Sequence, residues 1–238
     1  MRIAVSSRSF RRPLSSHDLT QLEWLERCAS LLEVDGVLAD VTDFPRTDAE
    51  YVAQLRKVAI DLGIVPFGID AADALDPDGE ASAREMLVEL ASGFGAAVIR
   101  TEAPAPGAVP PETFVRTVAA AKQLGRLAKA ANVTVVLAEA PGTIAADLAE
   151  AKHLIKDTDS AWLRACPSWS ALPHAGPKDR YPACVVAAGE DPTAVAAAAR
   201  NAWAIVEHTA AEPGDPWADV GEAIRALRAA DARLRTSV

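Results

Sequence analysis

The carboxylate of Glu139 closes an apolar stretch, VVLAEAPG at residues 135–142, just before the Pro141-Gly142 break. A carboxylate at the end of an apolar segment can bind a metal ion, transfer a proton, pair with a buried cation, or lie in solvent at the mouth of a loop. Other apolar segments also lead into chemically active side chains, namely Arg8, Asp40, Asp70, Arg100, Glu207 and His208. The function of Glu139 therefore depends on which of these ends the fold brings together.

Several kinds of chemistry have no candidate residues in this sequence. The lysines at 57, 122, 129, 152, 156 and 178 all lie outside the apolar segments, so an imine-forming lysine inside the fold is not expected. The four histidines show no HxH or HExxH spacing, which disfavours a paired-histidine metal site. The three cysteines form no CxxC pair and are expected to be reduced, with Cys166 a buried thiol rather than a nucleophile.

The elements that must position these side chains alternate in type. Short strand-like segments occur at 2–6, 36–40, 64–69, 96–101, 133–139, 161–166, 184–188 and 203–208. Helical periodicity separates them, and several segments are apolar on both faces, as buried parallel strands are. Eight such units predict a (β/α)₈ TIM barrel. An open doubly wound sheet is the alternative, but SSRSF follows the first strand where a GxGxxG fingerprint would be expected.

The connection after the sixth segment departs from this alternation. The stretch PSWSALPHAGPKDRYP, 167–182, contains four prolines and little helical periodicity. Proline removes a backbone donor and disrupts helix interiors. The sixth helix is therefore predicted to be missing or vestigial, with the barrel locally open beside it.

Length and charge limit the partners. The 238 residues suit one domain, 1–238, and the net charge of -9 gives no basic surface for nucleic acid. No apolar run is long enough for a signal peptide or a membrane span. We expect a cytoplasmic protein with a small-molecule substrate, and a homo-oligomer is compatible with the sequence.

In a barrel, the carboxyl ends of all the strands meet at one rim, where binding loops gather. We expect Arg8, Asp40, Arg100, Glu139 and Glu207 to converge there. Arg8, with Arg11 and Arg12, could grip a phosphate or carboxylate, or could belong to a solvated loop. Arg100 could instead form a structural salt bridge with Glu139 or Asp40.

The sequence resembles the sugar phosphate isomerase/epimerase family of xylose isomerase-like TIM barrels, which also include endonuclease IV-type enzymes. The resemblance covers nearly the whole chain. The segments that carry it are RIAVSSRSF at the start, DLGIVPFGI at 61–69, GAAVIR at 95–100, VTVVLAEAPGT at 133–143 and IVEH at 205–208. Their order and spacing together are more specific than any one of them.

The resemblance implies a divalent cation, Mn²⁺ or Mg²⁺, bound by residues at the ends of the last four strands. Glu139 and Glu207 match the first and last of these ligands. The two middle ligands, an Asp and a His, have no counterpart, because the sequence reads LRACPSW and ACVVAAG there. Hard cations take about six oxygen or nitrogen ligands, so we expect the metal site of Glu139 and Glu207 to be weak or absent.

Two functions follow from this resemblance. The first is an isomerase or epimerase for a sugar or sugar phosphate, in which Glu139 and Glu207 transfer protons and the substrate is bound by Arg8, Asp40, Arg100 and His208. The second is a noncatalytic ligand-binding pseudoenzyme or partner subunit with the same barrel. Fold alone does not separate them.

Overall fold

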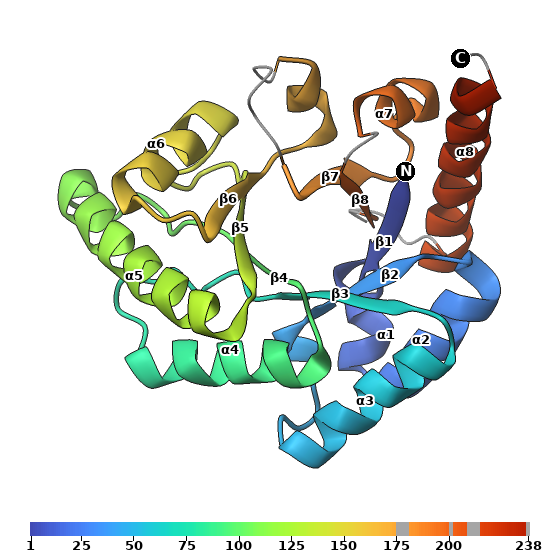
Figure 1. Ribbon diagram of the computed structural model, residues 1–238, viewed down its shortest axis with the longest axis horizontal. Helices are drawn as coiled ribbons and strands as arrows, with labels where there is room; N and C mark the ends of the chain where they lie inside the picture. The colour runs from blue at the N-terminus through green and yellow to red at the C-terminus, as the bar shows by residue number, and fades with distance from the viewer. Residues whose placement is uncertain (175–180, 200–201, 209–214, 237–238) are drawn as a thin grey trace.

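The computed structural model describes residues 1–174, 181–199, 202–208 and 215–236 (Figure 1). Within these ranges all strand pairing is parallel, in the order β6-β5-β4-β3-β2-β1-β8-β7. The strands are β1 Arg2–Ser6, β2 Gly36–Asp40, β3 Val65–Asp70, β4 Val98–Thr101, β5 Thr134–Ala138, β6 Leu163–Cys166, β7 Ala183–Ala187 and β8 Trp203–Glu207. The predicted (β/α)₈ barrel is confirmed.

Helices surround the strands, as Figure 1 shows. The α-helices are α1 Arg11–Ser15, α2 Gln21–Arg27, α3 Ala49–Asp61, α4 Ala81–Phe94, α5 Pro110–Ala131, α6 Leu148–Thr158, α7 Pro192–Ala198 and α8 Pro216–Thr236. Shorter helical segments are η1 Ser7–Phe10, η2 Cys28–Leu32, η3 Val41–Asp43 and η4 Trp169–His174. Among the helices described, none combines the length and apolarity that a membrane crossing requires.

Local sequence sets where these helices begin and end. The Asp48 side chain accepts a hydrogen bond from the Tyr51 N–H at 3.0 Å and caps the start of α3. At the ends of α4 and α5, Gly95 and Asn132 have φ values of 83° and 57°. This left-handed conformation suits glycine and asparagine and lets the chain turn directly into the next strand. The connections at the amino ends of the strands are therefore tight.

The barrel is nearly closed, and its weakest seam lies between β6 and β7. These strands are joined by the parallel bridge of Ser168 with Val185, where the Val185 N–H donates to the Pro167 carbonyl at 2.9 Å. In the described part of the connection after β6, the helical structure is the six-residue 3₁₀ segment η4. This agrees with the prediction that the helix after the sixth strand is vestigial. Residues 175–180 of the proline-rich stretch lie outside the described residues.

The inside of the barrel is apolar toward the amino ends of the strands and polar at their carboxyl ends. Its buried apolar cluster consists of Ala4, Leu38, Phe67, Val98, Val136, Cys166, Ala183, Trp203 and Ile205. Residues two apart in a strand share a face. Ser6, Asp40, Arg100 and Glu207 therefore lie on the same face as the apolar residues two positions before them, at the carboxyl end. The strand alternation thus delivers polar side chains to one rim.

A substitution at Gly68 of β3 tests how tightly the barrel interior is packed. A Cβ atom there would lie 2.5 Å from Val98 Cγ2 and 2.6 Å from Leu38 Cδ1. Gly68→Ala should lower the free energy of unfolding by about 1–3 kcal/mol, because extra volume in a packed core forces side chains from their rotamers. Urea denaturation measures the change.

Gly93→Ala is the matched control. Gly93 is exposed in α4, and a Cβ there would meet only Val52 Cγ1 at 3.3 Å. Alanine should leave stability unchanged or raise it by up to about 1 kcal/mol. Equal urea midpoints for both variants and the wild type would contradict the close packing around Gly68, because the added methyl group would then fit without cost.

Candidate active site

Five charged side chains form an alternating chain of ion pairs across the carboxyl rim, in the order Asp40, Arg8, Asp70, Arg100, Glu207. Arg8 Nε lies 3.2 Å from Asp40 Oδ2 and 2.7 Å from Asp70 Oδ2. Arg100 contacts Asp70 through Nε, at 3.1 Å, and through Nη2. The same Nη2 lies 2.5 Å from Glu207 Oε1. This ion-pair chain links η1 to the ends of β2, β3, β4 and β8.

Two further residues extend the ion-pair chain at its edges. Arg8 Nη1 donates to Glu102 Oε1 at 2.6 Å, and Arg11 Nη2 donates to Asp40 Oδ2 at 2.8 Å. The group then contains three guanidinium groups and four carboxylates, so it keeps a net negative charge. Arg8 and Arg11 are thus already paired with carboxylates of the protein.

The centre of the ion-pair chain is almost completely buried, with Asp70 0% and Arg100 1% exposed. Burial raises the pKa of Asp70, although the charges of Arg100 and Arg8 oppose the rise. Burial lowers the pKa of Arg100, but the charges of Glu207 and Asp70 outweigh burial and raise it overall. A guanidinium keeps its proton at any ordinary pH, so Arg100 supplies a permanent positive charge in contact with Asp70.

Glu207 is held as an anion. Burial by itself raises the pKa of Glu207, but the charge of Arg100 and hydrogen bonds from Arg100 and Ser6 lower it below the ordinary value. The alternative role of Arg100 was a structural salt bridge with Glu139 or Asp40, whereas its contacts are with Asp70 and Glu207. The reason is register, because Asp70 and Arg100 are direct partners across β3 and β4.

The pKa values of Asp40, at the end of β2, and Asp43, three residues later, are shifted in opposite directions. Burial raises the pKa of Asp40, but hydrogen bonds from Thr42 and the charges of Arg8 and Arg11 lower it overall. For Asp43, burial raises the pKa to about 6, and the Asp40 charge adds to this rise. Sequence analysis missed Asp43. Its position three residues after a strand-end carboxylate was the available signal.

Ser7 connects these two aspartates. Its hydroxyl accepts from the Asp40 N–H at 2.8 Å and donates to Asp43 Oδ2 at 2.6 Å. The Ser7 side chain is itself buried. Asp43 is therefore fixed beside the ion-pair chain, and no contact with an arginine is recorded for it among the described residues.

Glu139 lies just past the end of β5, at residue 138, and outside the ion-pair chain. Burial raises its pKa above the ordinary value, although backbone and side-chain hydrogen bonds from Ser168 oppose the rise. Its Oε1 is buried and has no hydrogen-bond partner among the described residues. The structure records no contact between Glu139 and Glu207, the two residues that the resemblance assigns to one metal site.

His208 follows β8 and lines a cavity of about 460 Å³ beside β7, α7 and α8. Its Nδ1 lies 3.7 Å from Asp219 Oδ2, and its backbone N–H donates to Ser9 Oγ at 2.9 Å. Its Nε2 is buried without a hydrogen-bond partner among the described residues.

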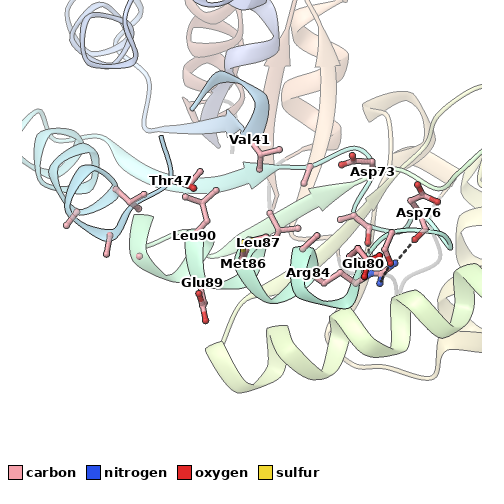
Figure 2. Close-up of a pocket in the computed structure, with 18 residues that line it drawn as sticks. Val41, Thr47, Asp73, Asp76, Glu80, Arg84, Met86, Leu87, Glu89 and Leu90 are labelled. Carbon is pink, nitrogen blue, oxygen red and sulfur yellow. Dashed lines mark hydrogen bonds between the residues drawn. The ribbon is translucent and has the colours of Figure 1, made fainter. Parts of the chain in front are cut away.

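A larger cavity, of about 640 Å³, lies in the outer layer between α3 and α4 (Figure 2). Figure 2 shows Leu87 and Leu90 of α4 turned toward Val41 and Thr47. None of the five residues of the ion-pair chain lines it. Cavity size therefore does not locate the polar site in this protein.

The described residues do not fit a divalent cation at Glu139 and Glu207. No group of three or more His, Cys, Asp and Glu side chains suited to a metal ion occurs in the described ranges. Glu207 is neutralised by Arg100, and burial raises the pKa of the fully buried Cys166 thiol. Strand β7, Ala183–Ala187, contributes no ligating carboxylate or imidazole.

No protein-family model and no curated protein matches this sequence. Solved structures do match. A D-psicose 3-epimerase, crystallised in the presence of D-fructose, has a TM-score of 0.72 at 14% identity, covering 99% of each chain. The probable 3-DHS dehydratase of petrobactin synthesis from Bacillus anthracis gives 0.74 at 13% identity, over 96% of this chain and 99% of that one.

A third match is the apo form of 3-keto-D-glucoside 4-epimerase from E. coli, with a TM-score of 0.72 at 12% identity over 96% of this chain and 99% of that chain. At such identities the likeness establishes the fold. One further matching structure is described as containing a xylose isomerase-like TIM barrel. The chain therefore has the fold of these barrels. The resemblance seen in the sequence is confirmed at this level.

Asp43→Asn tests the electrostatics of the rim. The pKa of Asp43 is raised from 3.8 to about 6, so the wild-type protein loses stability as pH rises through about 6 and the ionised carboxylate forms. The Asp43→Asn variant has no carboxyl group at this position to ionise, so it does not lose stability in this way. Relative to wild type, its free energy of unfolding should increase by about 1 kcal/mol between about pH 4 and pH 7, after allowing for partial exposure.

Urea denaturation at both pH values measures this difference, and the Asn side-chain oxygen can still accept from Ser7. Asp61→Asn, which changes an exposed carboxylate of α3, is the control for removing a carboxylate from the surface. A stability difference between Asp43→Asn and wild type that does not vary with pH would contradict the raised pKa.

Proposed function

We propose that this protein is an isomerase or epimerase of a sugar or related hydroxy-carbonyl compound, with Glu139 as the residue that transfers the proton. The main support is the state of Glu139, which has a raised pKa and a buried, unpartnered oxygen at the carboxyl rim. The fold adds support, because barrels of this kind include D-psicose 3-epimerase and 3-keto-D-glucoside 4-epimerase.

The reaction needs a base beside the carbon that carries the exchanging proton. Removing a proton next to a carbonyl gives an enediolate. Protonating the same carbon from the opposite face gives the epimer, whereas protonating the neighbouring carbon, with transfer of the hydroxyl proton between the two oxygens, gives the isomer. A base works best when its pKa lies close to the working pH. Burial moves the pKa of Glu139 in that direction, while Ser168 holds the carboxylate in position.

Glu207 suits a different role in this proposal. Its low pKa and its contact with Arg100 keep it ionised, so it would orient Arg100 and accept hydrogen bonds from substrate hydroxyls. Asp43, with a pKa of about 6, is a second group able to exchange a proton at this rim.

The proposed substrate contacts differ in accessibility. The Arg8 side chain is 21% exposed, whereas Asp40 and Arg100 are 4% and 2% exposed. Arg8 would therefore meet the substrate first. His208 would contact it from the cavity beside β8. The net negative charge of the described site favours an uncharged sugar over a sugar phosphate.

The proposed reaction does not depend on a divalent cation at Glu139 and Glu207, because the described donor set does not fit one. A cytoplasmic location and assembly into a homo-oligomer remain predictions. The alternative, a noncatalytic ligand-binding barrel or partner subunit, is favoured by one observation. The carboxylates around Arg8 are already paired within the protein.

Proton exchange in D₂O tests the proposal even when the product has not been identified. Wild-type protein is incubated with D-fructose, D-psicose, D-tagatose and fructose 6-phosphate, and loss of the proton next to the carbonyl is followed by NMR. Exchange should occur with at least one uncharged sugar and persist in EDTA. Glu139→Gln should slow it by about 10²-fold or more, because the base is lost.

Glu85→Gln, at an exposed position of α4, is the matched control and should exchange at the wild-type rate. Full activity in Glu139→Gln would exclude Glu139 as the base, and loss of activity in EDTA would contradict metal independence. If wild-type protein exchanges none of these protons but its melting temperature rises with the same sugars, the noncatalytic alternative is supported.

A further inference from the structure

We infer that the guanidinium group of Arg100 takes the place of a bridging cation between Asp70 and Glu207, and that removing it creates a binding site for a divalent metal ion. One atom carries the bridge. Nη2 of Arg100 contacts an oxygen of Asp70 and, at 2.5 Å, Oε1 of Glu207. The inference concerns these three side chains and does not rest on the proposed catalytic activity.

The two carboxylates are close enough to share an ion. Two oxygens that both contact one nitrogen within hydrogen-bond distance are separated by no more than about 6 Å. A Mg²⁺, Mn²⁺ or Ca²⁺ ion binds carboxylate oxygens at about 2.0–2.6 Å and can bridge a pair about 4–5 Å apart. An ion at the position of Nη2 would therefore have both oxygens near bonding distance.

The burial and the charge of the surroundings favour a cation at this position. The side chains of Asp70, Arg100 and Glu207 are 0%, 2% and 13% exposed. Carboxylates removed from water and left without a positive partner are strongly destabilising. Without Arg100, the positive group still in contact with Asp70 is Arg8, at 2.7 Å. Glu207 would lose the guanidinium that lowers its pKa.

The remaining neighbours fit a hard ion of modest affinity. Ser6, which hydrogen-bonds Glu207, offers a third oxygen, and water can complete the coordination. Arg8 opposes a second positive charge beside Asp70. The Cys166 thiol, whose pKa responds to Arg100, Glu207 and Asp70, is a poor ligand for hard ions. We therefore expect binding in the range of tens of micromolar to millimolar.

This arrangement gives Glu207 a positive partner other than a metal ion. Glu207 stands where the resembled family has its last metal ligand, but here an arginine from β4 occupies its carboxylate. The positive charge belongs to the polypeptide and cannot be removed by a chelator. Wild-type protein should accordingly be indifferent to divalent ions at this position.

Arg100→Ala with Mn²⁺ as the probe tests the inference. In EDTA the variant should melt well below the wild type, because two buried carboxylates lose their partner. With about 5 mM MnCl₂ its melting temperature should rise by several degrees, since an ion that binds only the folded state stabilises it. In a Mn²⁺ titration, the EPR signal of free Mn²⁺ should show a binding site that approaches about one equivalent at saturation for the variant, and no such site for wild type.

Two further variants locate the ion. Arg100→Ala with Glu207→Gln should bind Mn²⁺ at least about tenfold more weakly, because one bridging carboxylate is lost. Arg100→Lys keeps a cation and should fold without metal and show no Mn²⁺ response. Wild-type protein that binds Mn²⁺ as tightly as Arg100→Ala would overturn the inference. So would Arg100→Ala that folds without responding to Mn²⁺, that fails to fold in its presence, or that binds as tightly after Glu207→Gln.

Discussion

The buried ion pair of Asp70 and Arg100 is the interaction on which the carboxyl rim depends. Burial of either charge alone costs several kcal/mol, and the cost is offset only when partners and hydrogen bonds surround both. The fold meets this need through register, because the two residues face each other across β3 and β4. Arg8 and Glu207 then complete the partners of the pair from η1 and β8. Segments distant in sequence are thus fixed to one another by charge.

This network sets four carboxylates of the rim apart in two pairs, whereas Asp70, which is bound to two arginines, has a pKa that burial raises. Asp40 and Glu207 are bound to arginines and have lowered pKa values, so they remain anions and hold structure. Within the described ranges Glu139 and Asp43 have no arginine among their hydrogen-bond partners, and their pKa values are raised. Burial moves the pKa of both carboxylates of the second pair toward the range in which a general acid or base is most effective. The same electrostatic arrangement that stabilises the barrel therefore leaves specific positions free for chemistry.

Much of the fold could be read from the sequence because its signals are local. Strands at 2–6 and 36–40 have the predicted bounds, and the others differ by up to two residues at either end. Apolar runs of four to six residues report burial on both faces, and Gly95 and Asn132 report helix ends through their backbone conformation. The proline-rich connection after β6 was likewise visible, since proline acts on its own segment.

The sequence by itself determined the barrel, the common rim and the presence of Glu139, Arg100 and Glu207 at strand ends. It did not determine which charges pair, because pairing depends on strand register and on how side chains from different strands approach one another. Tertiary structure alone joined Arg100 to Asp70 and Glu207, separated Glu139 from that network, and set Asp43 beside Ser7. Residue type and spacing are properties of one segment, whereas ion pairs and pKa values are set by the three-dimensional neighbours that desolvate and charge each group.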